Sequence, residues 1–408
     1  MKLTWSSIKS FSLGFLLFFI AVIVADIYGG AGVTNLYYAG ALLLCLSSVP
    51  KMIKRRVVPI ELILYLILIV VVEFRNGQSS KFYFFGLVQL ASVVLVATYL
   101  STPRKIGYFI TGLALSLFLS SIYFLLFATN DVLKAIDSEL RHALPFFSVS
   151  SAGLMTALGY LLGFVFFLSR KDFKWLLLCL VCLAACLYTL SKNALLAIII
   201  ITVIYLFMSG VVRLSKEFWI IIGVLAVFIL FGGGLLNPIL KLYSEAIDTN
   251  NSYGIVSIAG RGSIWLYCIR TIPESPWVGN GYYTAIENMM SSLGEEFGQA
   301  HNCILHCLLS TGVVGLVLLT VYVVRLIIFI KRHYKIIMRF TFLRWVLCVL
   351  MYFVLRGLTE ASISQNLSLD VFWFFLLSLV MMGLVKRIEA VRKKKINENL
   401  AGKPLPVS

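Results

Sequence analysis

The sequence predicts an all-α, polytopic integral membrane protein of about twelve transmembrane helices, and three observations lead to this fold class. The hydrophobic fraction is 60% and the charged fraction is 13%, whereas soluble domains average roughly 45–50% and about 25%. Apolar runs close to the ~20 residues that cross a bilayer recur from Phe11 to Leu384. Basic residues gather in every second connection between these runs. We therefore expect a single membrane domain over residues 1–408.

The expected spans follow the apolar runs in chain order, and their connections are short with one exception. The exception is a polar connection at about residues 237–303, between the ninth and tenth spans. Because no small-residue cleavage site follows the first run, that run is interpreted as a retained helix rather than a cleaved signal peptide. The spans fall near residues 11–28, 33–49, 58–74, 82–100, 106–128, 150–168, 175–190, 194–210, 218–236, 304–330, 345–357 and 367–385.

The distribution of basic residues predicts the orientation of the chain. They cluster at Lys51–Arg56, Arg170–Lys174 and Lys331–Arg344, and again in the tail at 386–408. The positive-inside rule assigns these clusters, and with them both termini, to the cytoplasm. Membrane topology therefore explains the formal net charge of +17, without a nucleic acid as partner. Within the tail, Lys386–Lys395 could bind anionic lipid headgroups or could only stop translocation.

Three basic residues on the opposite, outer face are candidates for binding an anion. An ionisable residue at membrane depth costs free energy, so its presence there indicates a function. Lys192 lies in a tight turn between two apolar helices. Arg261 begins a helix-like segment of the long connection, where its guanidinium and free backbone N–H groups could bind phosphate. Arg356 closes the eleventh span and is followed by Glu360. The alternatives are contact with lipid headgroups for Lys192 and Arg261, and a structural ion pair for Arg356 with Glu360.

His301 is the candidate general base. It opens the tenth span at the membrane surface, where an imidazole can titrate near neutral pH and accept a proton from a hydroxyl. Asn302 is expected to fix the position of His301 or to cap the helix. His306 is expected to pack inside the helix, and Gly312 and Gly315 to allow close helix approach. Three cations and one base on a single face would suit a diphosphate leaving group and an incoming hydroxyl.

The segment from His301 to Cys307 contains four potential metal ligands. It lacks the carboxylate or second ligand pair that a metal site would need elsewhere in the chain, so we expect no metal ion and no cofactor. Cys268 and Cys303 both lie near the outer face, where a disulfide could form, but the sequence does not set the distance between them.

In these residues the sequence resembles the O-antigen ligase and polysaccharide polymerase superfamily of bacterial inner membranes. The resemblance covers about Leu187–Met382, and the first half of the chain matches only in its number of helices. The sequence departs from the family at Lys192, where members commonly carry arginine, and so loses a bidentate fork. The motifs appear in the order Thr189-Leu190-Ser191-Lys192, Gly260-Arg261 with Trp265, Pro276 to Gly279-Asn280-Gly281, His301-Asn302 with Gly312 and Gly315, and Arg356-Gly357 with Glu360.

The resemblance implies a metal-independent, inverting glycosyltransferase of the inner membrane whose donor is a glycan on undecaprenyl diphosphate. It implies that the long connection is periplasmic, and that Arg261, Lys192 and Arg356 bind the donor diphosphate. It further implies that His301 deprotonates the acceptor hydroxyl. Asn302, Glu360 and Trp265 would support these groups.

Three functions remain open from the sequence. A ligase would transfer the glycan to the lipid A-core, whereas a polymerase would transfer it to the next lipid-linked repeat unit. The ligase is favoured because Arg356-Gly357 with Glu360, after His301-Asn302, looks most like enterobacterial ligases. The third alternative is a transporter of lipid-linked glycan, which would often carry internal repeats or broken helices. We find no convincing repeat, and the unusual residues gather on one face.

Overall fold

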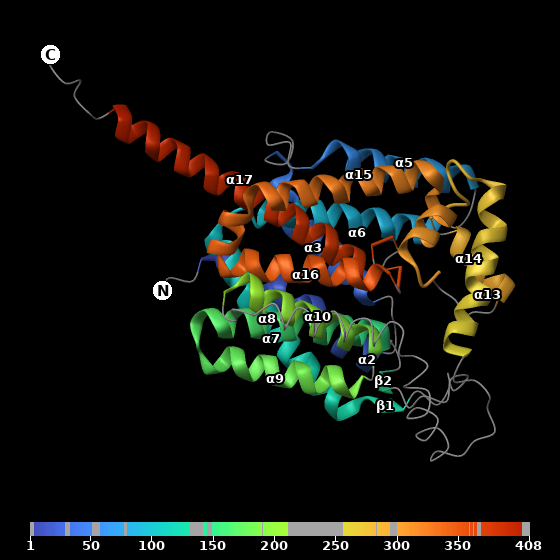
Figure 1. Cartoon of the computed structure of the whole chain (residues 1–408), viewed down its shortest axis with the longest axis horizontal. Helices are drawn as coiled ribbons and strands as arrows, with labels where there is room; N and C mark the ends of the chain where they lie inside the picture. Colours follow the sequence, from blue (N-terminus) through green and yellow to red (C-terminus); the bar gives the residue numbers. More distant parts are fainter. Residues whose placement is uncertain are drawn as a thin grey trace, which may run out of the picture.

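The computed structural model (Figure 1) describes most of the chain as helices that run side by side. Within the described elements, some side chains, including those of Lys192 and Arg261, also lie outside the description. The residues not described are 1–3, 29–32, 51–57, 77–79, 131–141, 145–148, 190, 211–255, 283, 294–299, 359, 362, 365–368 and 402–408.

The described part is almost entirely helical, which agrees with the predicted all-α class; its only strands are two short antiparallel ones. In the first half the elements are α1 (Trp5–Phe18), a π-helical turn (Phe19–Val24), α2 (Ala25–Tyr28), α3 (Val33–Cys45), a 3₁₀ turn (Leu46–Ser48), α5 (Ile60–Asn76), α6 (Ser80–Tyr99), α7 (Pro103–Phe127), β1 (Thr129–Asn130) and β2 (His142–Ala143). In the second half they are α8 (Val149–Arg170), α9 (Phe173–Tyr188), α10 (Lys192–Met208), α13 (Val256–Thr271), a 3₁₀ turn (Ile272–Glu274), α14 (Thr284–Leu293), α15 (Cys303–Arg339), α16 (Thr341–Gly357) and α17 (Leu369–Ala401).

Five of the described helical segments are long and apolar enough to cross a membrane. Four shorter apolar helical segments accompany them: Tyr37–Ser48, Leu87–Tyr99, Phe173–Tyr188 and Asn193–Met208. The expected span at 218–236 lies outside the described residues. The predicted number of about twelve spans therefore stays a prediction. The five long segments are Trp5–Val24, Pro103–Phe127, Ser150–Arg170, Cys303–Arg339 and Leu369–Lys394.

Local sequence explains where individual helices begin and how closely they pack. Helix α7 starts with Pro103 behind an N-cap, Thr102, whose side chain accepts from the backbone of Lys105. A Cβ at Gly112 would lie 2.1 Å from a carbonyl oxygen of α1, so α1 and α7 approach backbone to backbone. Small residues permit this in membrane proteins, where packing rather than water drives helix association.

The centre of the bundle is formed around α17. It is the most buried of the five long segments, and Trp373 and Phe374 within it are fully enclosed. In Figure 1, α13 stands across one end of the bundle, at a steep angle to the long helices, with α14 beside it. The N-terminal end of α15 and the C-terminal end of α16 lie at this same end, and it is here that the predicted site residues gather.

Candidate active site

Helix α15 is broken near its N-terminal end, at Gly312. This residue has φ 65° and ψ −168°, so the chain leaves the helical path and resumes it one residue later. Such a break removes the helical bonds that Val313 and Val314 would make to the carbonyls four residues earlier. In a membrane helix those freed groups need new partners, because each unpaired one costs several kcal/mol.

The loop that follows α13 supplies all the missing partners. Two of its carbonyls accept from the freed N–H groups after the break, and two of its N–H groups donate to the freed carbonyls before it. The side chain of Asn280 also donates to the carbonyl of Thr271 at the end of α13 (3.3 Å). The exchanged bonds are Val313 N to Pro276 O (2.8 Å), Val314 N to Trp277 O (3.0 Å), Asn280 N to Leu309 O (2.9 Å) and Gly281 N to Ser310 O (3.1 Å).

The contact is possible because both surfaces carry glycine. A Cβ at Gly279 would lie 2.5 Å from the backbone of Ser310, and a Cβ at Gly312 would lie 2.4 Å from the backbone of Trp277. Gly279 also has φ 74°, in the left-handed region. Gly312 was expected to allow close approach of a second helix, but it accommodates this loop instead.

The loop is held at its far end as well. Helix α14 begins at Thr284, whose backbone N–H and side-chain hydroxyl both donate to Oε1 of Glu73, at 3.1 and 2.9 Å. Glu73 lies near the C-terminal end of α5 and is buried. A carboxylate at a helix N-terminus is favoured by the helix dipole, so α5 anchors α14 over this end of the bundle.

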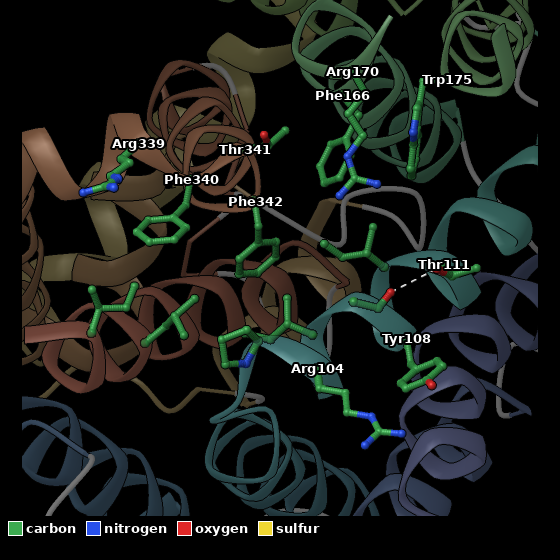
Figure 2. A pocket seen from close by; sticks show the side chains of 16 residues that line it. Arg104, Tyr108, Thr111, Phe166, Arg170, Trp175, Arg339, Phe340, Thr341 and Phe342 are labelled. Atoms are coloured by element: carbon green, nitrogen blue, oxygen red, sulfur yellow. Dashed lines mark hydrogen bonds between the residues drawn. The ribbon is translucent and has the colours of Figure 1, made fainter. Parts of the chain in front are cut away.

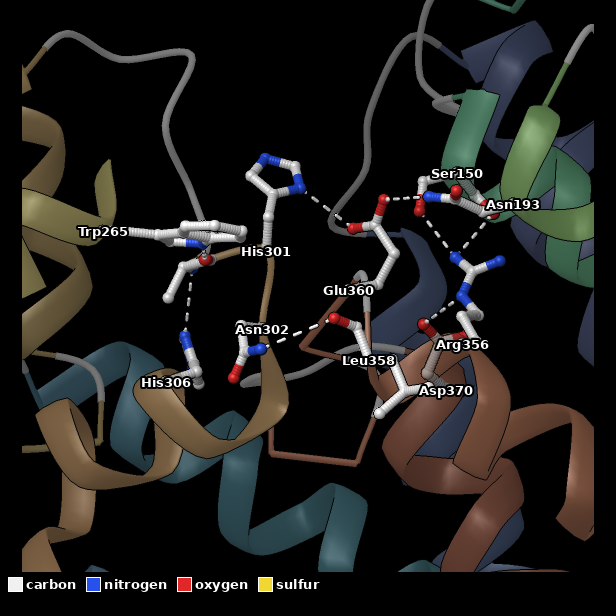
Figure 3. Close-up of polar contacts among 11 residues, drawn as sticks. Ser150, Asn193, Trp265, His301, Asn302, His306, Arg356, Leu358, Glu360 and Asp370 are labelled. Atoms are coloured by element: carbon white, nitrogen blue, oxygen red, sulfur yellow. Dashed lines mark hydrogen bonds and ion pairs between the residues drawn. The ribbon is translucent and has the colours of Figure 1, made fainter. Parts of the chain in front are cut away.

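His301 lies where this layer meets the end of α16. Its Nδ1 is 3.1 Å from Oε2 of Glu360, and Oε1 of Glu360 accepts from the side-chain amide of Asn193 at 3.3 Å. The side chain of His301 is 25% exposed and that of Glu360 is 10% exposed. Figure 3 shows the second ring nitrogen of His301 directed away from Glu360. His301 has φ 47°, an uncommon conformation for a residue other than glycine.

The residues on both sides of His301 fix its backbone. Asn302 is the N-cap of α15, and its Oδ1 accepts from Ile304 and Leu305 at 2.9 and 3.0 Å, which is one of the two roles predicted for it. On the other side, the indole of Trp265 donates to the carbonyl of Ala300 (3.0 Å). The Ala300 N–H donates to Nδ1 of the buried His306 (3.4 Å). The turn that carries His301 is therefore fixed from α13 and from α15 itself.

Arg356 is only 2% exposed. Its Nη1 donates to the hydroxyl of Tyr352 at 2.9 Å, and its Nη2 donates to the carbonyl and hydroxyl oxygens of Ser150 at 2.9 and 2.6 Å. Its Nε lies 3.3 Å from Oδ2 of Asp370 in a buried ion pair. The backbone carbonyl of Arg356 accepts from the N–H of Glu360 at 2.8 Å. Arg356 thus joins α8, α16 and α17 beneath the residue that contacts His301 (Figure 3).

The side chains of the other two predicted cations, Lys192 and Arg261, lie outside the described residues. Their backbones do not. Lys192 is the first residue of α10, directly before Asn193, and Arg261 lies on α13 one turn before Trp265. Each residue therefore lies close in sequence to a side chain of the site. Asn193 donates to Glu360, and Trp265 donates to the carbonyl of Ala300. Their contact with a diphosphate stays a prediction.

Sequence reasoning missed the partners that organise this site. Asn193 follows Lys192 in the predicted turn without a predicted role, and Asp370 falls inside the last predicted span at 367–385. An acid at the start of a buried span was the available signal, because such a residue requires a partner. Ser150 and Tyr352 carried no signal of this kind.

Among the described residues, no group of three or more His, Cys, Asp or Glu could hold a metal ion. All eight cysteines fall within the described part and are free thiols, so Cys268 and Cys303 are not joined. Burial raises the pKa of Cys268 to about 11, which keeps it as a neutral thiol.

Residues 176–320 match the family model described as O-antigen ligase. The chain carries an O-antigen ligase family domain. The resemblance predicted from the motifs is thereby confirmed for this segment, which includes α10, α13, α14, His301 and the break in α15. The matched segment ends at residue 320, before Arg356 and Glu360. This domain indicates glycan transfer of the O-antigen ligase or polymerase type. No curated protein matches the chain.

The docking of the loop onto the broken helix yields a prediction. Gly279→Ala should destabilise the protein in two ways: it strains a left-handed backbone, and its Cβ would clash with the Ser310 backbone. The clash should add roughly 1–3 kcal/mol to the cost of the strain. Gly210→Ala is the matched control, since Gly210 also has a positive φ (70°) but has nothing within 4 Å of a built Cβ. Thermal unfolding of the purified variants in detergent measures the difference. Equal loss in both would show that the loop does not pack against α15 as described.

Proposed function

We propose that this protein is an O-antigen ligase of the bacterial inner membrane. It transfers a glycan from undecaprenyl diphosphate to a hydroxyl of the lipid A-core during lipopolysaccharide assembly. The observation that carries the proposal is the contact between His301 and Glu360 beside the broken helix of the family domain. This contact combines a partly exposed imidazole with a nearly buried carboxylate that can fix its tautomer.

The chemistry needs one base and one site for a leaving group. The Glu360 carboxylate accepts a hydrogen bond from Nδ1–H of His301, so the lone pair on Nε2 can take the proton of the acceptor hydroxyl. The acceptor oxygen then forms a bond to the anomeric carbon as the bond from that carbon to the diphosphate breaks. The configuration inverts, undecaprenyl diphosphate leaves, and the proton passes from His301 to water.

The diphosphate carries the negative charge that develops in this step. Lys192 and Arg261 are proposed to bind it, because α10 and α13 bring their backbones to the His301 region. These two cations would supply the charge stabilisation that a metal ion supplies in other transferases, so the reaction is proposed to be metal-independent. Arg356 was predicted as a third ligand. Because its guanidinium is enclosed by Tyr352, Ser150 and Asp370, we propose that it acts indirectly, by holding the segment that carries Glu360.

The acceptor distinguishes the ligase from its alternatives. A polymerase would use the same base and donor site, and the described contacts are equally compatible with it. A transporter is favoured by a single observation, the broken helix α15. The backbone groups at that break are occupied by the loop after α13, however, and a base held by a carboxylate has no evident use in transport.

We further propose that the chain crosses the membrane about twelve times with both termini in the cytoplasm. This orientation places His301 on the periplasmic face, together with the loop at about 237–303. It also places the opposite ends of α15 and α16 in the cytoplasm, where Lys331, Arg332 and Lys335 are exposed.

Thiol labelling tests this topology. Single cysteines introduced near Tyr283 and Asn366 should react with a membrane-impermeant reagent in cells whose outer membrane has been permeabilised, whereas cysteines near Lys54 and Lys394 should not. The unsubstituted protein controls for the eight native cysteines. Labelling near Lys394 from outside would show that the orientation is the opposite one, with the site on the cytoplasmic face.

Substitution of the base tests the reaction. His301→Ala should lower transfer by roughly 10²–10⁴-fold, the usual contribution of a general base. His333→Ala is the matched control. His333 also pairs with a glutamate, Glu389, but it lies toward the C-terminal end of α15, away from the site. Both variants are expressed in cells, and their lipopolysaccharide and lipid-linked glycan are compared. Wild-type lipopolysaccharide in the His301 variant would remove this residue from the mechanism.

The material that accumulates identifies the acceptor. A ligase without its base leaves bare lipid A-core and long glycans on undecaprenyl diphosphate. An inactive polymerase leaves lipid A-core capped with single repeat units, so that pattern would overturn the ligase in favour of the polymerase.

A further inference from the structure

A cavity of about 630 Å³ lies at the end of the bundle opposite His301. Five helix ends meet around it: the start of α7, the end of α8, the start of α9, the end of α15 and the start of α16. Helix α17 also contributes to its lining. Helices α15 and α16 each run from this cavity to the site residues, His301 at one end of α15 and Arg356 near the end of α16. The cavity is therefore separate from the proposed active site, and its volume lies in the ~300–1,000 Å³ range of ligand pockets.

The side chains that line the cavity are of two kinds. Three are arginines, Arg104, Arg170 and Arg339, which are exposed and come from three different helix ends. Five are aromatic, and the remainder are largely aliphatic. None of the described lining residues is acidic, so no carboxylate there neutralises the arginines. Figure 2 shows the three arginines on different sides of the cavity, with Phe342 near the middle and Phe166 beside Arg170. The aromatic residues are Tyr108, Phe166, Trp175, Phe340 and Phe342.

This combination specifies the chemistry of a ligand. Guanidinium groups on three sides favour an anion with several oxygen acceptors, such as a phosphate. The guanidinium of Arg170 lies over the ring of Phe166, with 5.3 Å between its central carbon and the ring centroid, which restrains it at the boundary between charge and apolar wall. Phe340 is 39% exposed, and Tyr108 and Phe342 are partly exposed, so they form an apolar wall that a free phosphate ion would leave uncovered. A molecule that has both a phosphate and hydrocarbon chains would contact both the arginines and the apolar wall.

We propose that this cavity binds one anionic phospholipid. Its phosphate lies among Arg104, Arg170 and Arg339, and its acyl chains run along the aromatic wall toward the bilayer. The inference rests on the proposed membrane orientation, which places these helix ends at the cytoplasmic surface, where basic pockets between helices bind such headgroups. It does not depend on which glycan the protein transfers.

The experiment measures lipid retained by the intact purified protein, by mass spectrometry under non-denaturing conditions. The probes are phosphatidylglycerol and phosphatidylcholine at equal concentration. Replacing Arg104, Arg170 and Arg339 together with Gln should weaken phosphatidylglycerol binding about 100-fold, since losing two direct charge-assisted hydrogen bonds to the phosphate costs roughly tenfold each. The matched control replaces Lys331, Arg332 and Lys335 with Gln, which removes the same charge from exposed positions of α15 outside the cavity.

A second variant tests the cavity without removing charge. Gly107 lines the cavity on α7, and a Cβ built there has nothing within 4 Å, so Gly107→Trp would occupy open space. We expect this variant to lose phosphatidylglycerol although all three arginines remain. We expect the control triple variant to retain one phosphatidylglycerol, as the native protein does. Phosphatidylcholine should bind weakly to the native protein and to every variant.

Several results would overturn the proposal. Equal loss in the two triple variants would mean that only general surface charge attracts the lipid, and equal retention of both lipids would mean that the arginines do not select an anion. Displacement of phosphatidylglycerol by excess inorganic phosphate would show that the ligand is a free phosphate ion. Because no glycan transfer is measured, each of these outcomes leaves the ligase proposal to be decided by its own test.

Discussion

The constraint on which this structure depends is that a helix inside a bilayer cannot leave backbone groups unpaired. Helix α15 breaks at Gly312, and the loop from Pro276 to Gly281 takes up the bonds that the break releases. The loop is consequently fixed to the bundle rather than suspended above it. Glu73 on α5 fixes α14, the element that follows the loop. The polar layer at this end of the molecule is therefore positioned by main-chain hydrogen bonds and a helix cap.

That layer determines where His301 lies. Trp265 reaches from α13 to the carbonyl of Ala300, and Asn302 caps α15 on the other side, so the residue between them has little freedom. Its left-handed backbone, with φ 47°, is held by these neighbours. Backbone strain of this kind persists where surrounding contacts determine it, and it is common at functional sites. The result is an imidazole 3.1 Å from Glu360, which a separate network through Arg356 and Asp370 supports from below.

Much of this arrangement could be predicted from the sequence, because hydropathy and capping act locally. The helical class, the helix that begins after His301 and the cap at Asn302 follow from residues within a few positions of one another. The break at Gly312 could not be predicted in this way. A glycine in an apolar run has the same local pattern whether it admits a helix or a loop, and the loop that it admits lies more than 30 residues earlier in the chain. Arg356 and Asp370 lie on different helices, so their pairing depends on packing that no local pattern encodes.

The most direct test of the account is the rate of glycan transfer by purified protein in liposomes with lipid-linked donor and lipid A-core acceptor. The rate is compared among the native protein, His301→Ala, Glu360→Gln and the double variant. If Glu360 acts by orienting His301, the double variant will be no slower than His301→Ala, because residues that act as a unit are non-additive. Transfer by the native protein requires no translocation, so it also separates a transferase from a transporter. Losses that multiply in the double variant, or a native rate in His301→Ala, would contradict the account.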